Sequence, residues 1–298
     1  MTQRKLRIAS LALICALLLP LQAQNVSRSA RRAFIWKVKS DKATAYLLGS
    51  VHVAKSDIYP LGDNIEKAFK NSDVLVVEAD INAESPLAMA SQMLPRALYQ
   101  GDDKLENHIS EEMVKLVTSK LEESGLPAAY FLRFKPWFIA SMLTLMELKN
   151  LGITPENGID SHFLERARGE KQILELESVS AQLELLDSFS DREQETFLLY
   201  TLKDLENVGK NLDSMMNAWL RGDERSFTAL LNQAVKETPA SASIYKKLIS
   251  DRNHTMAARI EEYLNKEHTY FIVVGAGHLV GDDGLIKLLS RSHDVKQM

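Results

Sequence analysis

Cysteine is nearly absent from this chain of 298 residues, in which Cys15 is the only one. Cys15 lies inside an apolar run near the N-terminus. The bulky Ile14 before it argues against lipidation, which requires a small residue at that position. If the run is removed on export, the mature chain has no cysteine. It then forms no disulfide, and the absence of a thiol excludes cysteine-dependent catalysis.

Positive charge is not in excess either. The chain has 36 Lys+Arg residues and 40 Asp+Glu residues, which give a formal net charge of -4 at pH 7. Removal of a first segment that contains Arg4, Lys5 and Arg7 but no acidic residue would bring the net charge to about -7. The remaining chain has no basic stripe. We therefore expect no nucleic-acid partner.

Long apolar runs are missing beyond the first segment. The longest later run, at 138–148, is short and contains Glu147 near its end. A transmembrane helix needs about 20 predominantly apolar residues. We therefore expect no stable membrane span in the mature chain.

The N-terminal segment is typical of a signal peptide. A short basic stretch precedes the run at 8–21, which is apolar apart from Ser10, and Ala23 provides a small residue for cleavage. We predict a signal peptide over 1–23, cleavage after Ala23, and an exported protein that is periplasmic or secreted. The alternative is an uncleaved N-terminal anchor that leaves the rest of the chain facing the periplasm.

Two β-type runs open the mature chain, at 34–38 and 45–48, and the polar residues between them predict a hairpin. A helix over 62–70 then leads to 74–77, a wholly apolar run that predicts a strand buried on both faces. A strand–helix–strand unit of this length implies that the strands at 45–48 and 74–77 form a parallel pair.

The middle of the chain is mainly helical, and the last third returns to an α/β pattern. Further strands are predicted at 172–176, 270–274 and 294–297. Periodic segments predict helices near 85–98, 110–124, 136–150, 158–168, 190–208, 211–221, 223–236, 244–265 and 285–289. We predict a mixed α/β fold whose central mixed sheet is built from both ends of the chain. One domain over 24–298 would contain this sheet, with helical insertions at about 85–168 and 178–240.

Three side chains that suit a metal site follow three of the predicted strands. His52 and His278 close two Gly-x-x-His motifs, Gly49-Ser-Val-His52 and Gly275-Ala-Gly-His278, and Glu78 closes the strand at 74–77. Parallel strands place their carboxyl ends at one crevice, where ligands bind. Two imidazoles and a carboxylate suit zinc, manganese, cobalt or iron. Each histidine alone could instead be a hydrogen-bonded structural residue, and Glu78 a helix cap or half of a salt bridge.

Other polar residues could complete this site. Glu177 follows the strand at 172–176, although it could also be a charge at the start of the next helix. Asp160 could be a helix cap or a supporting acid. The spacing of Arg252, Asn253 and His254 indicates no more than a solvated helix face.

In their order along the chain, these motifs resemble the TraB/GumN family over about residues 34–297. The motifs are Leu48-Gly-Ser-Val-His52, Val77-Glu78-Ala-Asp80, Gly158-Ile-Asp160, Leu176-Glu177-Ser178, Asp251-Arg252-Asn253 and Gly275-Ala-Gly-His278-Leu279. That family includes a pheromone-shutdown protein of conjugative plasmids, a protein encoded with xanthan biosynthesis, and the Tiki metal-dependent proteases. The resemblance implies a fold related to the erythromycin-esterase-like group.

The resemblance also implies roles for the residues of the site. His52, Glu78 and His278 would form the metal site, with Glu78 as a third ligand or as the general base. Supporting residues would be Glu177, Asp160, Arg252 and Asn253. We expect a secreted metal-dependent hydrolase that uses Mn²⁺, Co²⁺ or Zn²⁺ and cleaves peptide or protein substrates. The alternatives are a non-catalytic module that sequesters a peptide, and a metal-dependent hydrolase of a non-peptide ester.

Overall fold

The computed structural model describes residues 34–205, 208–235 and 238–298. The predicted signal peptide, with Cys15 and the cleavage position after Ala23, lies outside the described residues. Within the described ranges, no helix combines the length and the apolar character needed to cross a membrane.

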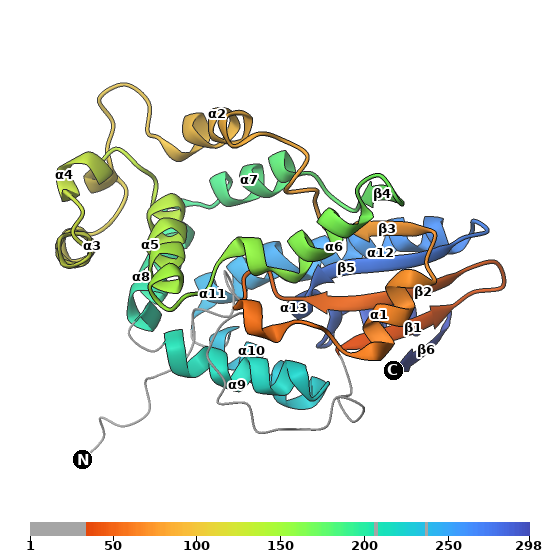
Figure 1. The fold of residues 1–298 in the computed structure, drawn as a ribbon. Coiled ribbons are helices and arrows are strands. Elements are labelled where there is room, and N and C mark those ends of the chain that lie inside the picture. The colour runs from red at the N-terminus through yellow and green to blue at the C-terminus, as the bar shows by residue number, and fades with distance from the viewer. Residues whose placement is uncertain (1–33, 206–207, 236–237) are drawn as a thin grey trace, which may run out of the picture.

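A mixed sheet forms the centre of the fold, and both ends of the chain contribute to it (Figure 1). Its strands are β1 (Ile35–Lys39), β2 (Thr44–Ser50), β3 (Val74–Val77), β4 (Gln172–Glu175), β5 (Thr269–Gly275) and β6 (Asp294–Gln297), in the order β4-β3-β5-β2-β1-β6. The neighbouring strands from β4 to β2 are parallel, and β1 is antiparallel to both β2 and β6. The predicted mixed α/β fold, the first hairpin and the last edge strand are confirmed.

The predicted pairing of the first strand–helix–strand unit differs in one respect. β2 and β3 run in the same direction, but β5 lies between them, and Ile272 of β5 is level with both Leu47 and Val76. The central position suits β5 because its residues from Tyr270 to Gly275 are all buried. The position of β5 between β2 and β3 brings its carboxyl end directly between the carboxyl ends of those two strands.

Helices cover the sheet and form most of the middle of the chain (Figure 1). They are α1 (Asp63–Lys70), α2 (Pro86–Ala97), α3 (Glu111–Glu123), α4 (Ala128–Phe131), α5 (Pro136–Asn150), α6 (Ile159–Ala167), α7 (Val179–Asp187), α8 (Asp191–Leu205), α9 (Val208–Leu220), α10 (Glu224–Val235), α11 (Pro239–Tyr245), α12 (Asp251–Leu264), α13 (Ala276–Leu279) and α14 (Leu285–Leu289). The helix predicted over 244–265 is interrupted by a π-helical turn at Lys246–Ser250. Such turns occur frequently at functional sites.

Buried apolar side chains form two clusters. One surrounds the sheet and includes Phe271, whose ring lies 4.7 Å from that of Phe163. The other lies among the inserted helices around Trp137 and includes Phe197 and Leu248. Leu248 and Phe197 also line the cleft described below, so the candidate site lies where the inserted helices meet the ends of the central strands.

Candidate functional site

The side chains of His52, Glu78 and His278 face one small space in front of Gly275. A methyl group built on Gly275 would lie 3.0 Å from His52 Nε2, 3.4 Å from Glu78 Oε2 and 3.4 Å from His278 Cδ2. His52 and Glu78 directly follow the ends of β2 and β3, and His278 lies in α13 after β5. The structure therefore brings the three predicted residues together, and glycine keeps the space between them open.

A cleft of about 210 Å³ contains this space. Its walls combine polar residues of the three strand ends with apolar residues of α7, α8 and the π-helical turn. Besides the three predicted side chains, the lining includes Gln182, Leu185, Phe197, Leu248, Arg252 and Gly275. This mixture of a mainly apolar wall and a few convergent polar groups is typical of a small-molecule or substrate site.

His278 presents one unprotonated nitrogen to the cleft. Its Nδ1 lies 2.6 Å from Asn253 Oδ1, and Asn253 Nδ2 donates to the backbone oxygen of Asp283 at 2.8 Å. The second bond fixes the orientation of the amide, so His278 donates from Nδ1 and keeps a lone pair on Nε2. Burial lowers the pKa of His278 to about 3 despite the nearby Glu78 carboxylate, so the imidazole is neutral at neutral pH.

His52 is oriented by a carboxylate. Its Nδ1 donates to Asp160 Oδ2 at 2.9 Å, and the Ser50 hydroxyl donates to the same oxygen. Nε2 of His52 is therefore the nitrogen that faces Gly275. Desolvation lowers the pKa of His52, but the charge and hydrogen bond of Asp160 outweigh this effect and raise the pKa to about 9.

Asp160 lies in the first turn of α6 but does not cap that helix. The N-cap residue is Gly158, and a side chain there would collide with the backbone of His52. This close approach places the Asp160 carboxylate beside Ser50 and His52. Asp160 is therefore hydrogen-bonded to an imidazole and is not the N-cap of α6, and its role in the function of the site stays a prediction.

Glu78 is surrounded by hydrogen-bond donors. Its Oε2 accepts the N–H of Gly275 at 3.0 Å, and its Oε1 accepts Gln182 Nε2 at 2.9 Å and Arg252 Nη2. Burial raises the pKa of Glu78, but attraction to His278 in its protonated form, to Arg252 and to His52 outweighs burial and holds the pKa well below its usual range. Glu78 is therefore an ionised carboxylate at the floor of the cleft.

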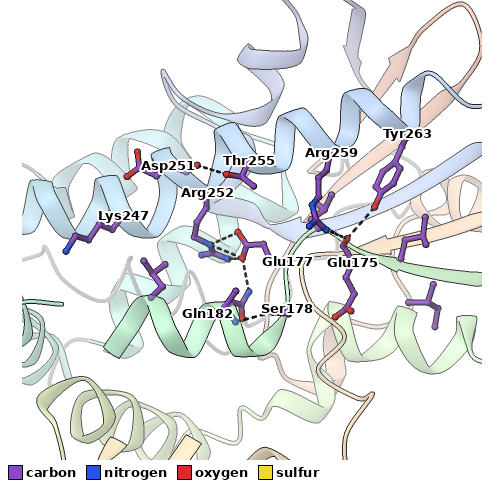
Figure 2. Close-up of a pocket in the computed structure, with 15 residues that line it drawn as sticks. Glu175, Glu177, Ser178, Gln182, Lys247, Asp251, Arg252, Thr255, Arg259 and Tyr263 are labelled. Atoms are coloured by element: carbon purple, nitrogen blue, oxygen red, sulfur yellow. Dashed lines mark hydrogen bonds and ion pairs between the residues drawn. The ribbon is translucent and has the colours of Figure 1, made fainter. Parts of the chain in front are cut away.

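Arg252 joins two carboxylates. Its Nη2 reaches Glu177 Oε2 at 2.8 Å (Figure 2). The same nitrogen donates to Glu78, and Nη1 donates to the Leu248 backbone oxygen at 2.9 Å. The Leu248 oxygen belongs to the π-helical turn, which thus helps to orient the guanidinium. The prediction of a solvated helix face is wrong for Arg252 and for the fully buried Asn253, whereas the neighbouring His254 is exposed.

Two polar residues of the site were not predicted. Ser50 contributes its hydroxyl to Asp160, and Gln182 of α7 contacts Glu78 and also Glu177 at 3.4 Å. Ser50 lies inside the first Gly-x-x-His motif, two residues before His52, so its hydroxyl was the available signal. Gln182 has no comparable signal, because the packing of α7 over the strand ends depends on distant contacts.

The donor chemistry of the cleft fits a divalent transition metal in part. Both histidines have Nδ1 held by a hydrogen-bond acceptor, which is the usual support of a metal-binding imidazole. His278 Nε2 and Glu78 Oε1, two acceptor atoms, lie 3.8 Å apart. This separation suits two ligands that are each about 2 Å from one ion. However, across residues 34–205, 208–235 and 238–298 no group of three or more His, Cys, Asp or Glu side chains is in position to hold a metal ion.

Comparisons with known proteins identify relatives along almost the whole described chain. The uncharacterised protein YbaP of Escherichia coli (strain K12) is 30% identical over 245 residues, which cover 82% of this chain and 87% of YbaP. The metalloprotease TIKI1 of Xenopus tropicalis is 25% identical over 321 aligned positions that cover 90% of this chain and 61% of TIKI1. Human TIKI1 is 24% identical, with 89% and 61% covered.

No solved structure matches the chain, so the relationship to the erythromycin-esterase-like group stays a prediction. The match to a known family is clear, because it extends over residues 34–294 and includes every motif of the cleft. The chain belongs to the TraB/PrgY/gumN family.

Proposed function

We propose that this protein is an exported metal-dependent hydrolase that cleaves peptides in the cleft at Gly275. The observation that carries the proposal is the convergence of His52, Glu78 and His278 on one space, each from the end of a different parallel strand. Membership of a family with metalloprotease relatives supports the same reaction class.

In this proposal the two imidazoles would hold an ion through Nε2. His52, which its pKa of about 9 leaves protonated at neutral pH, would release its Nε2 proton when the ion binds. Asp160 and Asn253 fix the rings from the opposite side, so neither histidine needs to reorient for its Nε2 to reach the cleft. Glu78 adds the negative charge that a divalent cation requires. When bound, Mn²⁺, Co²⁺ or Zn²⁺ would supply Lewis-acid polarisation of the scissile carbonyl.

Arg252 is proposed to contact the substrate. A guanidinium has five N–H donors, and Glu78, Glu177 and the Leu248 oxygen engage four of those on Arg252. Among the described residues, none accepts the second N–H on Nη1, which is therefore available to a ligand. At the edge of the cleft it could stabilise the negative charge that develops on the carbonyl oxygen during hydrolysis, or hold a substrate carboxylate.

A second candidate function is supported by the hydrogen bonds that the Glu78 carboxylate already accepts from the protein. Both of its oxygens already accept protein donors, and one is paired with Arg252. A cleft of this kind needs no ion to be stable, and would suit a module that binds and sequesters a peptide without cleaving it.

Metal content and cleavage separate these two functions. The mature protein would be incubated with a peptide library in the presence of Mn²⁺, Co²⁺ or Zn²⁺ and again with EDTA, with mass spectrometry of the products. His52→Ala and His278→Ala should abolish both bound metal and cleavage, whereas His254→Ala, an exposed histidine on α12, should change neither. Wild-type cleavage by either cleft variant contradicts the hydrolase proposal. Peptide binding that is independent of metal and without products favours the sequestering module.

Export is a separate part of the proposal. It is supported by the basic and apolar segment over 1–23. N-terminal sequencing of the protein from a periplasmic fraction should find a chain that begins at Gln24. Recovery of the full-length chain in the membrane fraction would instead support the uncleaved anchor.

A further inference from the structure

A second and larger pocket adjoins the cleft. Its volume is about 720 Å³, and it shares Gln182, Leu185 and Arg252 with the cleft. Its walls are the strand β4, the first turns of α7 and one face of α12 (Figure 2). We call it the β4–α12 pocket. β4 is an edge strand that pairs only with β3, so a chain bound at Arg252 has room to continue along β4.

Most charged side chains that line the β4–α12 pocket are already engaged by protein partners. The basic groups lie on the side of the π-helical turn and α12, acidic groups lie on both sides, and most of them have an ion-pair or hydrogen-bond partner. The pairs are Lys247 with Glu193 (2.8 Å), Arg252 with Glu177 (2.8 Å), Asp251 with Lys246 (2.5 Å), and Glu175 with the backbone N–H of Asp80 (2.6 Å).

Arg259 differs from the other basic groups of the lining, Lys247 and Arg252, which are both in ion pairs. It is exposed on α12, and within the described part of the chain its guanidinium makes no ion pair. Its Nη1 donates only to the backbone oxygen of Glu175, at 3.2 Å, and Tyr263 donates to the same oxygen at 3.3 Å. The pocket therefore contains an uncompensated guanidinium. The planar guanidinium of arginine can donate two parallel hydrogen bonds to a carboxylate, which is the common anionic group of peptides.

The spacing of Arg259 from the cleft fits a peptide. Arg252 and Arg259 are seven residues apart on α12, which corresponds to about 10 Å along the helix axis. An extended chain advances about 3.3 Å per residue. A peptide that lies along β4 with one group at Arg252 would therefore bring a residue about three positions away to Arg259.

We propose that the β4–α12 pocket binds the part of an extended peptide that flanks the cleft, and that Arg259 binds a carboxylate of that peptide. The preferred ligands are then acidic peptides, with an Asp, a Glu or a terminal carboxylate about three residues from the group at Arg252. The inference rests on the proposed function for the identity of the ligand as a substrate, but the binding itself does not require cleavage.

Binding is tested first on its own. Fluorescein-labelled peptides of alanine, serine and glycine that carry one glutamate, and the same peptides with glutamine, would be titrated against the mature protein by fluorescence anisotropy. Wild-type protein should bind the glutamate peptides about tenfold more tightly. Arg259→Gln should remove this preference, and Arg259→Glu should reverse it in favour of lysine peptides. Equal binding of glutamate and glutamine peptides overturns the inference.

Two control variants separate charge recognition from structural damage. Tyr263→Phe removes a hydrogen bond to the same Glu175 oxygen without changing charge, so it should leave the ratio between glutamate and glutamine peptides intact. Arg291→Gln neutralises an exposed arginine beside β6, at the opposite edge of the sheet, and should have no effect. Loss of the preference in either control overturns the role of Arg259.

Cleavage measured on the same peptides distinguishes this inference from the proposed function. Glutamate preference without cleavage in any metal supports the pocket and contradicts the hydrolase. Cleavage without glutamate preference supports the hydrolase and contradicts the pocket. Tighter binding of an oligosaccharide of uronic acids than of any acidic peptide contradicts the assignment of the ligand as a peptide.

Discussion

Asn253 accepts the Nδ1 hydrogen of His278 at 2.6 Å, and its own amide is held by the backbone oxygen of Asp283. Both residues are almost completely inaccessible to solvent. The neutral side-chain amide of Asn253 therefore keeps the proton of His278 on Nδ1.

Replacement of Asn253 by leucine tests this relationship. Without its acceptor, the Nδ1–H of His278 is buried and unpaired, which costs about 1–3 kcal/mol of unfolding free energy. Loss of such a supporting partner also lowers metal affinity about 10–100-fold. Urea denaturation and competition with a chelator measure the two effects. Asn265→Ala, on the exposed end of α12, is the control, and unchanged metal affinity in Asn253→Leu would contradict the assigned tautomer.

Gly275→Ala should block the cleft. The added methyl group would lie 3.0 Å from His52 Nε2, in the space that the three side chains share. The φ of -48° and ψ of 132° at Gly275 are accessible to alanine, so the variant should fold. We expect activity to fall at least about 100-fold, equivalent to about 2.7 kcal/mol of barrier, as measured with the best peptide of the library.

Gly277→Ala is the matched control for this change. A methyl group at Gly277 has no neighbour closer than 3.8 Å, so activity should stay within about twofold of wild type. Equal loss of activity in both variants would show that alanine disturbs α13 in general, and would contradict a specific role for the space at Gly275.

Arg252→Met should destabilise the protein. It leaves Glu78 and Glu177, both largely buried, without their shared cation. Removal of one partner from a buried ion pair costs about 3–5 kcal/mol. The midpoint of urea unfolding should fall accordingly, and the added substitution Glu177→Gln should restore part of the loss. An unchanged midpoint in Arg252→Met would mean that solvent stabilises the charges of Arg252, Glu78 and Glu177, and would contradict a buried ion-pair network.

Acid stability should depend on Glu193. Burial raises the pKa of this carboxyl, but hydrogen bonds from Lys247, Ser243 and Ser190 outweigh it and lower the pKa to about 2 from the ordinary 4.5. The folded state therefore binds this proton less readily than the unfolded state. The resulting stabilisation is fully present above about pH 4.5 and is lost as the pH falls towards 2.

The size of this effect follows from the shift in pKa. Solvent screening reduces it to at most about 3 kcal/mol at neutral pH, and Glu193→Gln should remove it. Urea unfolding at pH 7 and at pH 3 measures the difference, with Glu267→Gln, an exposed glutamate, as the control. A stability gap between wild type and Glu193→Gln that does not narrow on acidification would contradict the assignment.

The residues of the cleft differ in how much of their role can be predicted from sequence. His52, Glu78 and His278 stand directly after apolar strands, a local pattern that predicts both their direction and their meeting. Arg252 and Asn253 have helical neighbours of ordinary polarity, and only the family resemblance pointed to them. Their partners Glu78, Glu177 and His278 come from other parts of the chain, and no local period encodes such contacts.

For the fold as well, local sequence patterns predict some features, whereas features that depend on distant contacts cannot be predicted. Apolar runs and helical periods predict where most strands and helices lie. They do not predict that β5 separates β2 from β3, because strand order depends on which buried surfaces fit together. The π-helical turn at Lys246–Ser250 also escapes the sequence pattern, since the apolar spacing on either side of it is still helical.

The central position of β5 has a consequence for biosynthesis. This strand lies at 269–275, far along the chain, yet one edge of β2 and one edge of β3 pair with it. A nascent polypeptide released before that point would expose two unpaired strand edges and would lack His278. The cleft therefore assembles only after β5 and α13 have been synthesised, and a product truncated before them cannot form it.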